Sequence, residues 1–528
     1  MKKRITQTAK YWQHQFEIDD KVLQSLKQRV RDLGSPLSID KVCLFFIRNI
    51  LEKERKTIRS ELQGAEPYRP DQKYAVNDKI VFPHWGFTIG KVVSVRPGYN
   101  PVDKRFDIIE VAFPKSSDTI AQLAANIKTP HKLLEKSDED DQTEDIISIS
   151  QKIYKRYKQH IRPKIEYFIK NDGSFVSFKK NCFLKELLPK IQEGLLNIVD
   201  AVIDINGKPM SVDDLIEPLE LYPKGKITDA SRFSINYYLH NDNRFENVGT
   251  PDLVLWYLNR LRPPQLRAPI YHLQVKKTSF NVNVLSGDLR AFLADIDDEV
   301  TPIEYTTTTS DTKTVKFTLI YPHLHAGTIP VLPAVLDILP TADSELLILN
   351  FIDGQTGETF LGWLIEETNY IFGFENWYKK YNLPVGTLIT LKKTENPLEL
   401  IIDFNPQRRR PEVVTVAKIN NDRLTFQMER KRITAKYDEL MLFSVVHPHE
   451  VERYSNRLEK QGVSLSQLME DIFPELMQLS PHSAVHVKTL YSAVNIVKRY
   501  PPGPIFYELV THKSFESLGD GYWFYRNM

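Results

Sequence analysis

The period of the hydrophobic positions changes several times along the chain, which predicts elements of different kinds. Residues 18–63 place apolar side chains at helical spacing. Residues 68–134 instead set short β-branched runs between glycines, which is typical of strands joined by tight turns and predicts a small β-barrel. Residues 185–262 and 450–528 read as helices that end in a hairpin. Strand-like sequence dominates two further ranges, 315–405 and 411–445.

An internal repeat is the most informative pattern. Phe245–Gly249 and Phe515–Gly519 share the motif Phe-Glu-Ser/Asn-aliphatic-Gly, and each precedes a short strand that contains Trp256 or Trp523. Both copies follow helical sequence. Helices followed by a hairpin form the outline of a winged helix, in which glycine permits the turn and tryptophan packs the strand onto the helices. The repeat therefore predicts two winged helices.

The first copy resembles the HARE-type winged helix of the delta subunit of bacterial RNA polymerase, over roughly Leu187 to Leu261. Its second helix would follow Ser211 as N-cap, and its third, recognition-like helix would cover Asp229 to Asn241. If Ile235, Tyr238 and Leu239 form the buried stripe of that helix, three polar residues point outward, where they could contact base edges: Arg232, Asn236 and His240. Phe233 and Tyr237 form an alternative stripe, and the resemblance also allows protein binding.

A second resemblance lies between Tyr321 and Phe404. Its carrying segments are His325–Pro330, Leu347–Asp353, Gly362–Ile365, Ile371–Tyr378 and Tyr381–Leu391. Their order resembles the DNA-binding pseudobarrel of plant B-three transcription factors and of certain restriction endonucleases. In that family one barrel edge enters the major groove, and the resemblance implies that Glu366–Asn369 and Lys392–Thr394 form part of it here. The alternative is a barrel that serves as a scaffold or contacts protein.

These patterns predict an α+β multidomain chain with winged helices, a small SH3-like β-barrel and a DNA-binding-type β-pseudobarrel. Its 528 residues are too many for one ordinary domain. The expected parts are a helical N-terminal region (1–65), a small SH3-like or KOW-like barrel (66–135), an acidic linker (136–150), a basic stretch with a winged helix (151–262), a linker (263–314), the pseudobarrel (315–405), a basic β-extension (406–446) and a C-terminal winged helix (447–528). The last copy departs from the pattern because a distinct third helix is hard to place there.

The distribution of charge adds more than its total. With 70 basic and 68 acidic residues, the net charge is only +2. Six cations and no acid, however, lie between Lys152 and Lys164, and residues 405–436 hold nine basic against three acidic residues. Such clusters beside a DNA-binding fold favour phosphate contacts. The expected nucleic-acid contacts are Arg232, Asn236, His240, Lys392, Lys393, Arg408, Arg409, Arg410, Arg430, Lys431, Arg432, Lys155, Arg156 and Lys158.

Several classes of function are disfavoured by the sequence. Two cysteines cannot form a disulfide framework or a Cys-rich zinc site, and they fit a reducing compartment. No apolar stretch approaches the length of a membrane span, and no signal-peptide pattern follows Met1, so we expect a cytoplasmic protein. The P-loop, the Gly-x-Ser-x-Gly elbow and the His-Glu-x-x-His motif do not occur.

Two His-x-His pairs, His323/His325 and His447/His449, could each present two metal ligands from a strand. Pro322 and Pro448 indicate loops instead, so we expect neither a metal site nor a cofactor. The favoured function is a non-enzymatic DNA-binding protein with a transcription- or genome-related role and double-stranded DNA as partner. The alternatives are a protein-interaction adaptor associated with RNA polymerase and the specificity component of a defence nuclease. The sequence leaves the DNA preference and the oligomeric state open.

Overall fold

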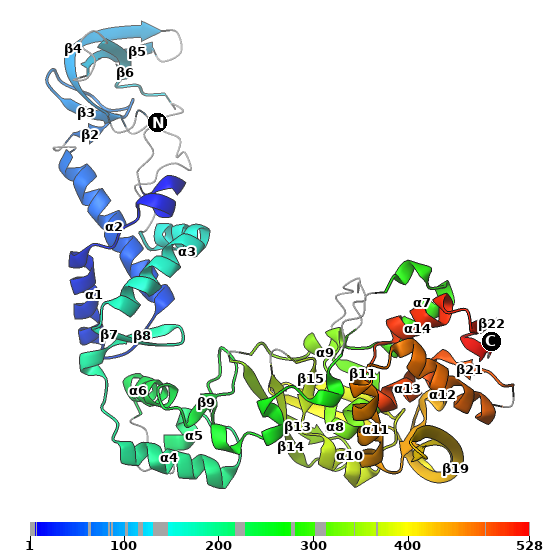
Figure 1. Ribbon diagram of the computed structural model, residues 1–528. Helices are drawn as coiled ribbons and strands as arrows, with labels where there is room; N and C mark the ends of the chain where they lie inside the picture. The colour runs from blue at the N-terminus through cyan, green and yellow to red at the C-terminus, as the bar shows by residue number, and fades with distance from the viewer. Residues whose placement is uncertain are drawn as a thin grey trace. The chain divides into compact units, whose positions relative to one another are not determined.

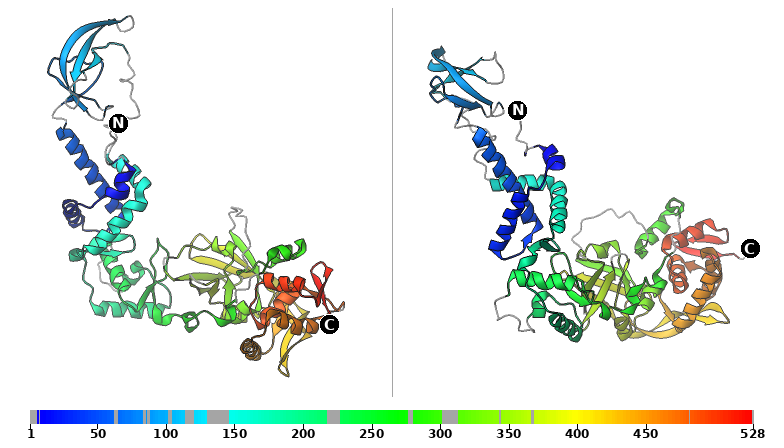
Figure 2. Two further views of the ribbon diagram at one scale, coloured as in Figure 1. Left: turned by 45° about the horizontal axis from the view of Figure 1, so that its top comes forward. Right: turned by 60° about the vertical axis from the view of Figure 1, so that its left-hand side comes forward.

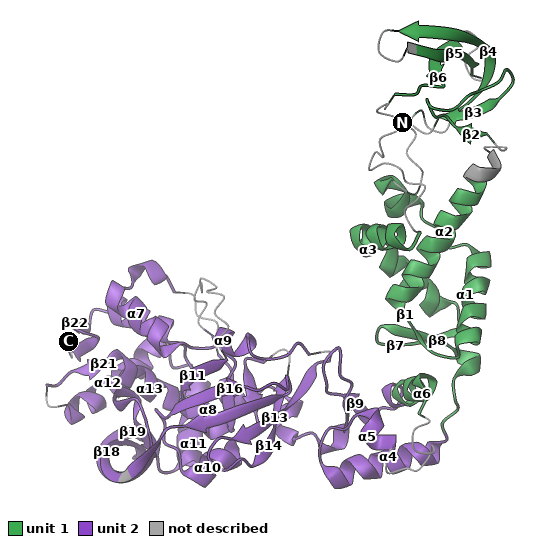
Figure 3. Ribbon diagram, turned by 180° about the vertical axis from the view of Figure 1, so that it is seen from behind, with its two compact units in different colours: residues 1–191, 222–238 green, residues 192–221, 239–528 purple. Residues whose placement is uncertain are grey.

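The computed structural model describes the chain except for residues 1–5, 7, 62–64, 83–84, 86–87, 101–103, 114–119, 130–145, 217–226, 276–279, 301–312, 343, 366–367, 481 and 527–528. The chain forms two compact units (Figure 3). Unit 1 comprises residues 1–191 and 222–238, and unit 2 comprises residues 192–221 and 239–528. The predicted α+β class is confirmed, because helices alternate with several separate sheets (Figure 1).

Unit 1 contains a module of three helices and three short strands, which we call the first module. Its elements are α1 (Asp20–Leu33), β1 (Leu37–Ser38), α2 (Ile39–Glu61), α3 (Ile146–Asn171), β7 (Phe175–Phe178) and β8 (Asn181–Leu184). Its sequence is interrupted once, between α2 and α3. The three strands form an antiparallel sheet in the order β1-β8-β7. Asp19 caps the start of α1 by accepting from the backbone N–H of Lys21, and Gly34 ends it in the left-handed conformation. Helices α2 and α3 pack against each other, and both carry fully buried residues, among them Phe46, Ile47 and Ile161.

A five-stranded sheet is inserted between α2 and α3. Its strands are β2 (Glu66–Pro67), β3 (Lys79–Phe82), β4 (Thr88–Asn100), β5 (Lys104–Ala112) and β6 (Ile120–Ala125), in sequence order across the sheet. Alternate residues of β3, β4 and β5, such as Ile80, Val92 and Ile109, form its core. The strands expected in residues 68–134 are therefore present. The acidic segment 136–145 lies outside the described residues, and α3 begins directly after it.

The largest sheet lies in unit 2 and has seven strands. They are β11 (Thr314–Thr318), β12 (Thr328–Pro330), β13 (Leu346–Asp353), β14 (Thr359–Ile365), β15 (Tyr370–Phe372), β16 (Leu388–Lys393) and β17 (Glu399–Phe404). Their order is β11-β16-β17-β13-β14-β15-β12, and the sheet curls strongly into a half-barrel (Figure 2). The short helices α8 (Tyr321–Ala326), α9 (Pro333–Leu336) and α10 (Glu375–Tyr381) accompany it. Asn382, in the left-handed conformation, ends α10, and Gly386 follows at φ 92°, a backbone conformation that favours glycine.

The middle of the chain carries a shorter set of elements. They are α4 (Glu193–Asn206), α5 (Val212–Ile216), α6 (Asp229–His240), β9 (Phe245–Asn247) and β10 (Trp256–Leu258). Ser211 accepts from the backbone N–H of Asp214 at the start of α5, which confirms the predicted N-cap. A β-bridge joins Met210 to Trp256. Residues 263–314, expected as a linker, contain α7 (Gly287–Ile296) and the short 3-10 helices η7 (Pro264–Arg267), η8 (Tyr271–Leu273) and η9 (Val282–Val284).

The C-terminal part of unit 2 begins with a long hairpin, β18 (Pro406–Asn420) and β19 (Arg423–Ala435), to which β20 (Phe443–Val445) adds in parallel. Helix α11 (Pro448–Lys460) follows. The C-terminal module then comprises α12 (Leu465–Leu479), β21 (Val485–His486), α13 (Val487–Val497), α14 (Pro502–Thr511), β22 (Phe515–Gly519) and β23 (Tyr522–Tyr525). Helix α14 is the one that directly precedes the β22–β23 hairpin. The strand order β21-β23-β22 repeats that of the first module.

Among the described residues, the order helix–strand–helix–helix–hairpin occurs three times, if the Met210 bridge counts as a strand and the five-stranded sheet inserted in the first copy is left aside. A common pattern marks each copy. The first strand of every hairpin begins with a buried phenylalanine: Phe175, Phe245 and Phe515. Six residues earlier stands a fully buried aliphatic residue in the third helix: Ile169, Leu239 and Leu509. Each of the three copies thus has the same spacing between a buried aliphatic residue in the third helix and the buried phenylalanine of the hairpin.

A buried ionic network lies inside unit 2. Arg499, which is 2% exposed, donates from Nη2 to Asp298 Oδ2 at 2.6 Å and to Glu299 Oε1 at 2.7 Å. Tyr491 OH donates to Asp298 Oδ2 at 2.7 Å, and His323 Nε2 lies 3.3 Å from Glu299 Oε1. Because the acids follow α7 and Arg499 follows α13, the network joins the C-terminal module to the segment that precedes the half-barrel.

Candidate nucleic-acid interface

Helix α3 presents a cationic face to solvent. Its 26 residues hold seven basic side chains and one acidic side chain. Ile153, Tyr157 and Ile161 are buried against the module, and the opposite side of the same turns is exposed. That exposed side carries Lys152, Lys155, Arg156, Gln159 and His160. Two of the predicted contact residues, Lys155 and Arg156, therefore lie on an open helix surface.

The cations on the side of α3 that faces α2 have a different role. Asp40 of α2 accepts a hydrogen bond from Tyr154 OH, and it lies 3.6 Å from Lys158 Nζ and 3.4 Å from Arg162 Nη1. The Tyr154 hydrogen bond and these two cations outweigh the effect of burial and lower the pKa of Asp40. The predicted contact Lys158 thus helps to hold α3 on α2, although its side chain is about half exposed.

The turn between β7 and β8 adds two cations that the sequence prediction did not include. Lys179 occupies the left-handed region at φ 51°, and the exposed Lys180 follows it. The carbonyl of Lys180 accepts from the N–H of Ile39 at 2.8 Å, which ties the turn to the start of α2. The turn follows α3 after only a few residues. The third helix and the hairpin of this module therefore both carry exposed cations, close together in the sequence. The sequence signal for this basic turn is the pair Lys179-Lys180 between two short runs of strand-forming residues.

The three residues predicted on α6 have mixed surroundings. Arg232 Nη1 lies 3.4 Å from Asp229 Oδ1, Asn236 is half-buried and His240 is exposed. Ile235 and Leu239 are buried, as the first alternative required, but Phe233 of the other stripe is buried as well. The assignment of these residues to a nucleic-acid contact remains a prediction.

The half-barrel separates the other predicted residues into two groups. Strands β14 and β16 run antiparallel to the adjacent pair β13 and β17, so both end at the same edge of the sheet. Lys392 and Lys393 are exposed at this edge. The other predicted part of the edge, Glu366–Asn369, lies partly outside the described residues. Strand β17 ends at the opposite edge, and the arginine-rich hairpin starts there. The structure thus does not bring Lys392 and Lys393 together with the arginine clusters.

The β18–β19 hairpin does bring the two arginine clusters side by side. Its register places Pro411 opposite Arg432 and Val413 opposite Arg430, and residues directly opposite share a face. Arg430 and Arg432 are exposed on that face. Lys431 points to the other face, where its Nζ lies 2.8 Å from Ser444 Oγ. Among the remaining predicted contacts, Arg408 and Arg410 are exposed, and the side chain of Arg409 lies outside the described part of the chain.

The interpretation of the His-x-His pairs as loop residues is wrong for His323, His325 and His449, which lie in helices, whereas His447 lies before α11 as its N-cap. Pro322 and Pro448 stand in the first turns of helices α8 and α11, where the missing N–H and the fixed φ of proline suit the helix. The two histidines of the first pair also face different surroundings. His323 is buried against Thr328 and Glu299, whereas His325 turns toward Tyr321 and His272. Burial, together with the neighbouring His272, lowers the pKa of His325.

Comparisons with protein families, with curated proteins and with solved structures return no match for this chain. Within the part of the chain that the structure describes, no helix combines the length and the apolar character needed to cross a bilayer.

Proposed function

We propose that the chain is a non-enzymatic DNA-binding protein with a transcription- or genome-related role, and that α3 with the β7–β8 turn is its main duplex-contacting surface. The observation that carries the proposal is the exposed cationic face of the third helix in unit 1. A helix fits the major groove, which is about 12 Å wide. Lys155 and Arg156 would reach base edges or phosphates from α3, while Lys180 would contact phosphates from the turn.

The fold assignment behind this proposal is a winged helix. In unit 1 it is supported by the order helix–strand–helix–helix–hairpin and by the strand order β1-β8-β7. We extend the assignment to the α4–β10 segment and to the C-terminal module on the same element order. The inserted five-stranded sheet is proposed to be SH3-like. The half-barrel, with seven strands and α8 and α10 between them, is proposed to be a DNA-binding-type pseudobarrel with Lys392 and Lys393 at its contacting edge.

The arginine hairpin is proposed as a second, sequence-independent contact to phosphates. Arg408, Arg410, Arg430 and Arg432 are exposed there. One observation favours the adaptor alternative for this hairpin: Val413 and Met428 are 54% and 51% exposed on the face that carries Arg430. Exposed apolar groups beside arginine are typical of protein interfaces. Binding of RNA polymerase through this hairpin is therefore the second candidate.

The proposal is tested by fluorescence anisotropy with a random-sequence DNA duplex over a series of salt concentrations. The parent protein is expected to lose affinity steeply as salt rises. The triple variant Lys155→Ala, Arg156→Ala and Lys180→Ala should flatten the slope of log K against log salt by about 2–3, since each phosphate contact contributes about 0.9.

The matched control removes the same charge from exposed positions of the inserted sheet and of its β2–β3 connection: Lys73→Ala, Lys91→Ala and Arg105→Ala. It should retain the slope of the parent. A flat salt response in the parent, or equal slopes for the two triple variants, would contradict the proposed surface. The double variant Arg430→Ala and Arg432→Ala then measures the hairpin contribution, both to DNA and, in a pull-down at fixed salt, to RNA polymerase.

A further inference from the structure

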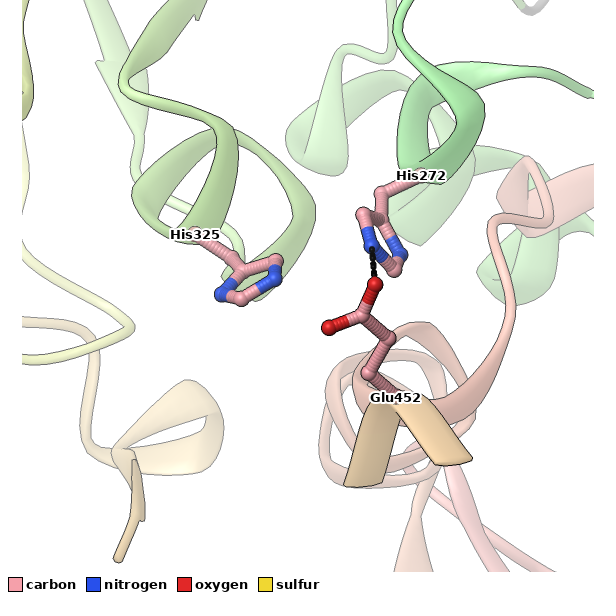
Figure 4. A group of neighbouring side chains, drawn as sticks. All are labelled: His272, His325 and Glu452. Atoms are coloured by element: carbon pink, nitrogen blue, oxygen red, sulfur yellow. Dashed lines mark ion pairs between the residues drawn. The ribbon is translucent and has the colours of Figure 1, made fainter. Parts of the chain in front are cut away.

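Three side chains from distant parts of the sequence meet within unit 2. His272 lies on η8, His325 on α8 and Glu452 on α11 (Figure 4). One ligand atom from each lies within 4.8 Å of the other two, and all three residues are half-buried. His272 Nε2 is 3.6 Å from Glu452 Oε1, and the two imidazole rings are 4.8 Å apart between centroids. Figure 4 shows the three side chains pointing toward one another.

Two of the three elements that carry these residues, α8 and η8, also have contacts outside the cluster. The ring of His325 stacks on Tyr321, with 5.4 Å between centroids and 15° between planes. Gly327 ends α8 at φ 65°, in close approach to Glu375 of α10. The N–H of Ile270 donates to Tyr370 OH at 3.1 Å, which holds η8 near β15. The site therefore does not depend on a single mobile loop.

Two imidazoles and one carboxylate are the donor set of many zinc sites. An ion pair alone does not explain why all three side chains lie together. One carboxylate faces two neighbouring imidazoles, and these rings would repel each other if both were protonated. A metal ion uses all three groups at once and requires both rings to be neutral. Zn–N and Zn–O bonds of about 2.0–2.2 Å place tetrahedral donors about 3.3 Å apart, so small side-chain rotations would close the site.

We propose that His272, His325 and Glu452 bind one zinc ion, with a water molecule as the fourth ligand. A cavity of about 140 Å³ adjoins the two histidines and is lined in addition by Tyr271, Tyr321 and Arg499, so it provides room for the water. His449 lies close, with its Nδ1 3.8 Å from Glu452 Oε2, but its side chain is 89% exposed. We therefore place it outside the ligand set. The ion would clamp η8, α8 and α11 to one another, independently of the proposed DNA contact.

The test uses the full chain, stripped with a chelator, dialysed against zinc and analysed for bound metal by mass spectrometry. One zinc ion per chain is expected. His325→Ala and His272→Ala should each lower the zinc affinity by more than the roughly 10–100-fold that outer-shell changes cost. Glu452→Gln keeps the size of the side chain and removes its charge, and it should weaken zinc binding as well. Cobalt substitution should give the absorption of a tetrahedral site in the parent and not in these variants.

Two histidine variants act as controls, His449→Ala beside the site and His482→Ala on an exposed surface elsewhere in unit 2. Both should retain zinc. Thermal unfolding of the metal-free variants separates loss of a zinc ligand from loss of the fold. His325→Ala and Glu452→Gln should melt at about the same temperature as the metal-free parent. Absence of bound zinc in the parent overturns the proposal. So does zinc that survives both His272→Ala and His325→Ala, or zinc that is lost with His449→Ala.

Discussion

The first module of unit 1 and the C-terminal module of unit 2 share an element order but differ in what surrounds the third helix. In both, a strand precedes the second helix, and a hairpin that begins with a buried phenylalanine follows the third. Helix α3 spans 26 residues with a kink at Tyr157, and it carries exposed cations. Helix α14 is short, and its residues Pro502–Phe506 and Leu509 are buried. The comparison teaches that element order defines the scaffold, while the composition of the third helix decides whether its surface is open.

The two modules also use arginine differently. Arg156 of α3 is exposed, with its guanidinium 5.6 Å from the ring of Tyr157. Arg499, between α13 and α14, is buried and paired with Asp298 and Glu299. A buried guanidinium is tolerated only when carboxylates and hydrogen bonds replace its hydration. The C-terminal module is thus anchored by charge inside unit 2, whereas the first module keeps this charge at its surface.

The largest expected effect is that of breaking this anchor. Arg499→Ala leaves Asp298 and Glu299 as buried carboxylates without their cation, and we expect a loss of about 3–5 kcal/mol in the stability of the C-terminal module. Hydrogen exchange of the α13 and α14 amides measures this local free energy.

Arg156→Ala on the exposed face is the matched control and should stay within about 0.5 kcal/mol of the parent, measured on the amides of α3. Equal costs for the two arginine variants would remove the distinction between an anchored and an open module.

Equivalent core positions in the two modules should lose similar stability on substitution. Leu509 and Ile169 occupy the same place six residues before the hairpin phenylalanine, and both are 0% exposed. Leu509→Ala and Ile169→Ala should each cost about 2–5 kcal/mol, because each removes buried methyl groups and leaves a cavity. Urea titrations followed by hydrogen exchange measure both.

Tyr167, which is 73% exposed on α3, provides the contrast within the same helix. Its replacement by alanine should change stability by less than about 0.5 kcal/mol. If Ile169→Ala were equally mild, the proposed equivalence of the two modules would be lost.

The sequence predicted the local elements better than their assembly. The repeat motif located the hairpins at Phe245 and Phe515, because the Phe-Glu pair and the tryptophan strand recur there. It missed the hairpin at Phe175, which has neither the glutamate nor a tryptophan and keeps only the buried phenylalanine and Ile169. The inserted sheet also hid the first module, since it separates α2 from α3 along the chain.

Contacts between distant segments could not be read from spacing at all. The basic stretch before Lys164 was recognised, but the sequence does not show that Asp40 binds the inner side of that helix. The arginine clusters were expected beside the barrel, but the sequence does not show at which edge, and the strand directions put them at the edge opposite Lys392. His272, His325 and Glu452 belong to three separate ranges, so only the fold reveals their cluster.

The smallest expected effect is on the stability of α3 against α2, and it depends on pH. The hydrogen bond from Tyr154 and the cations Lys158 and Arg162 lower the pKa of Asp40 in the folded state. A carboxyl group with a lowered pKa stabilises the fold above its unfolded pKa of about 3.9 and loses this contribution as the pH falls through the folded value. The side chain of Asp40 is 47% exposed, so solvent screening limits the gain to about 1 kcal/mol or less. Asp40→Asn should therefore lower the protection of the α3 amides slightly at pH 7 and make little difference near pH 2. A difference between parent and variant that grows toward acid would show that Asp40 does not hold α3 as an ionised group.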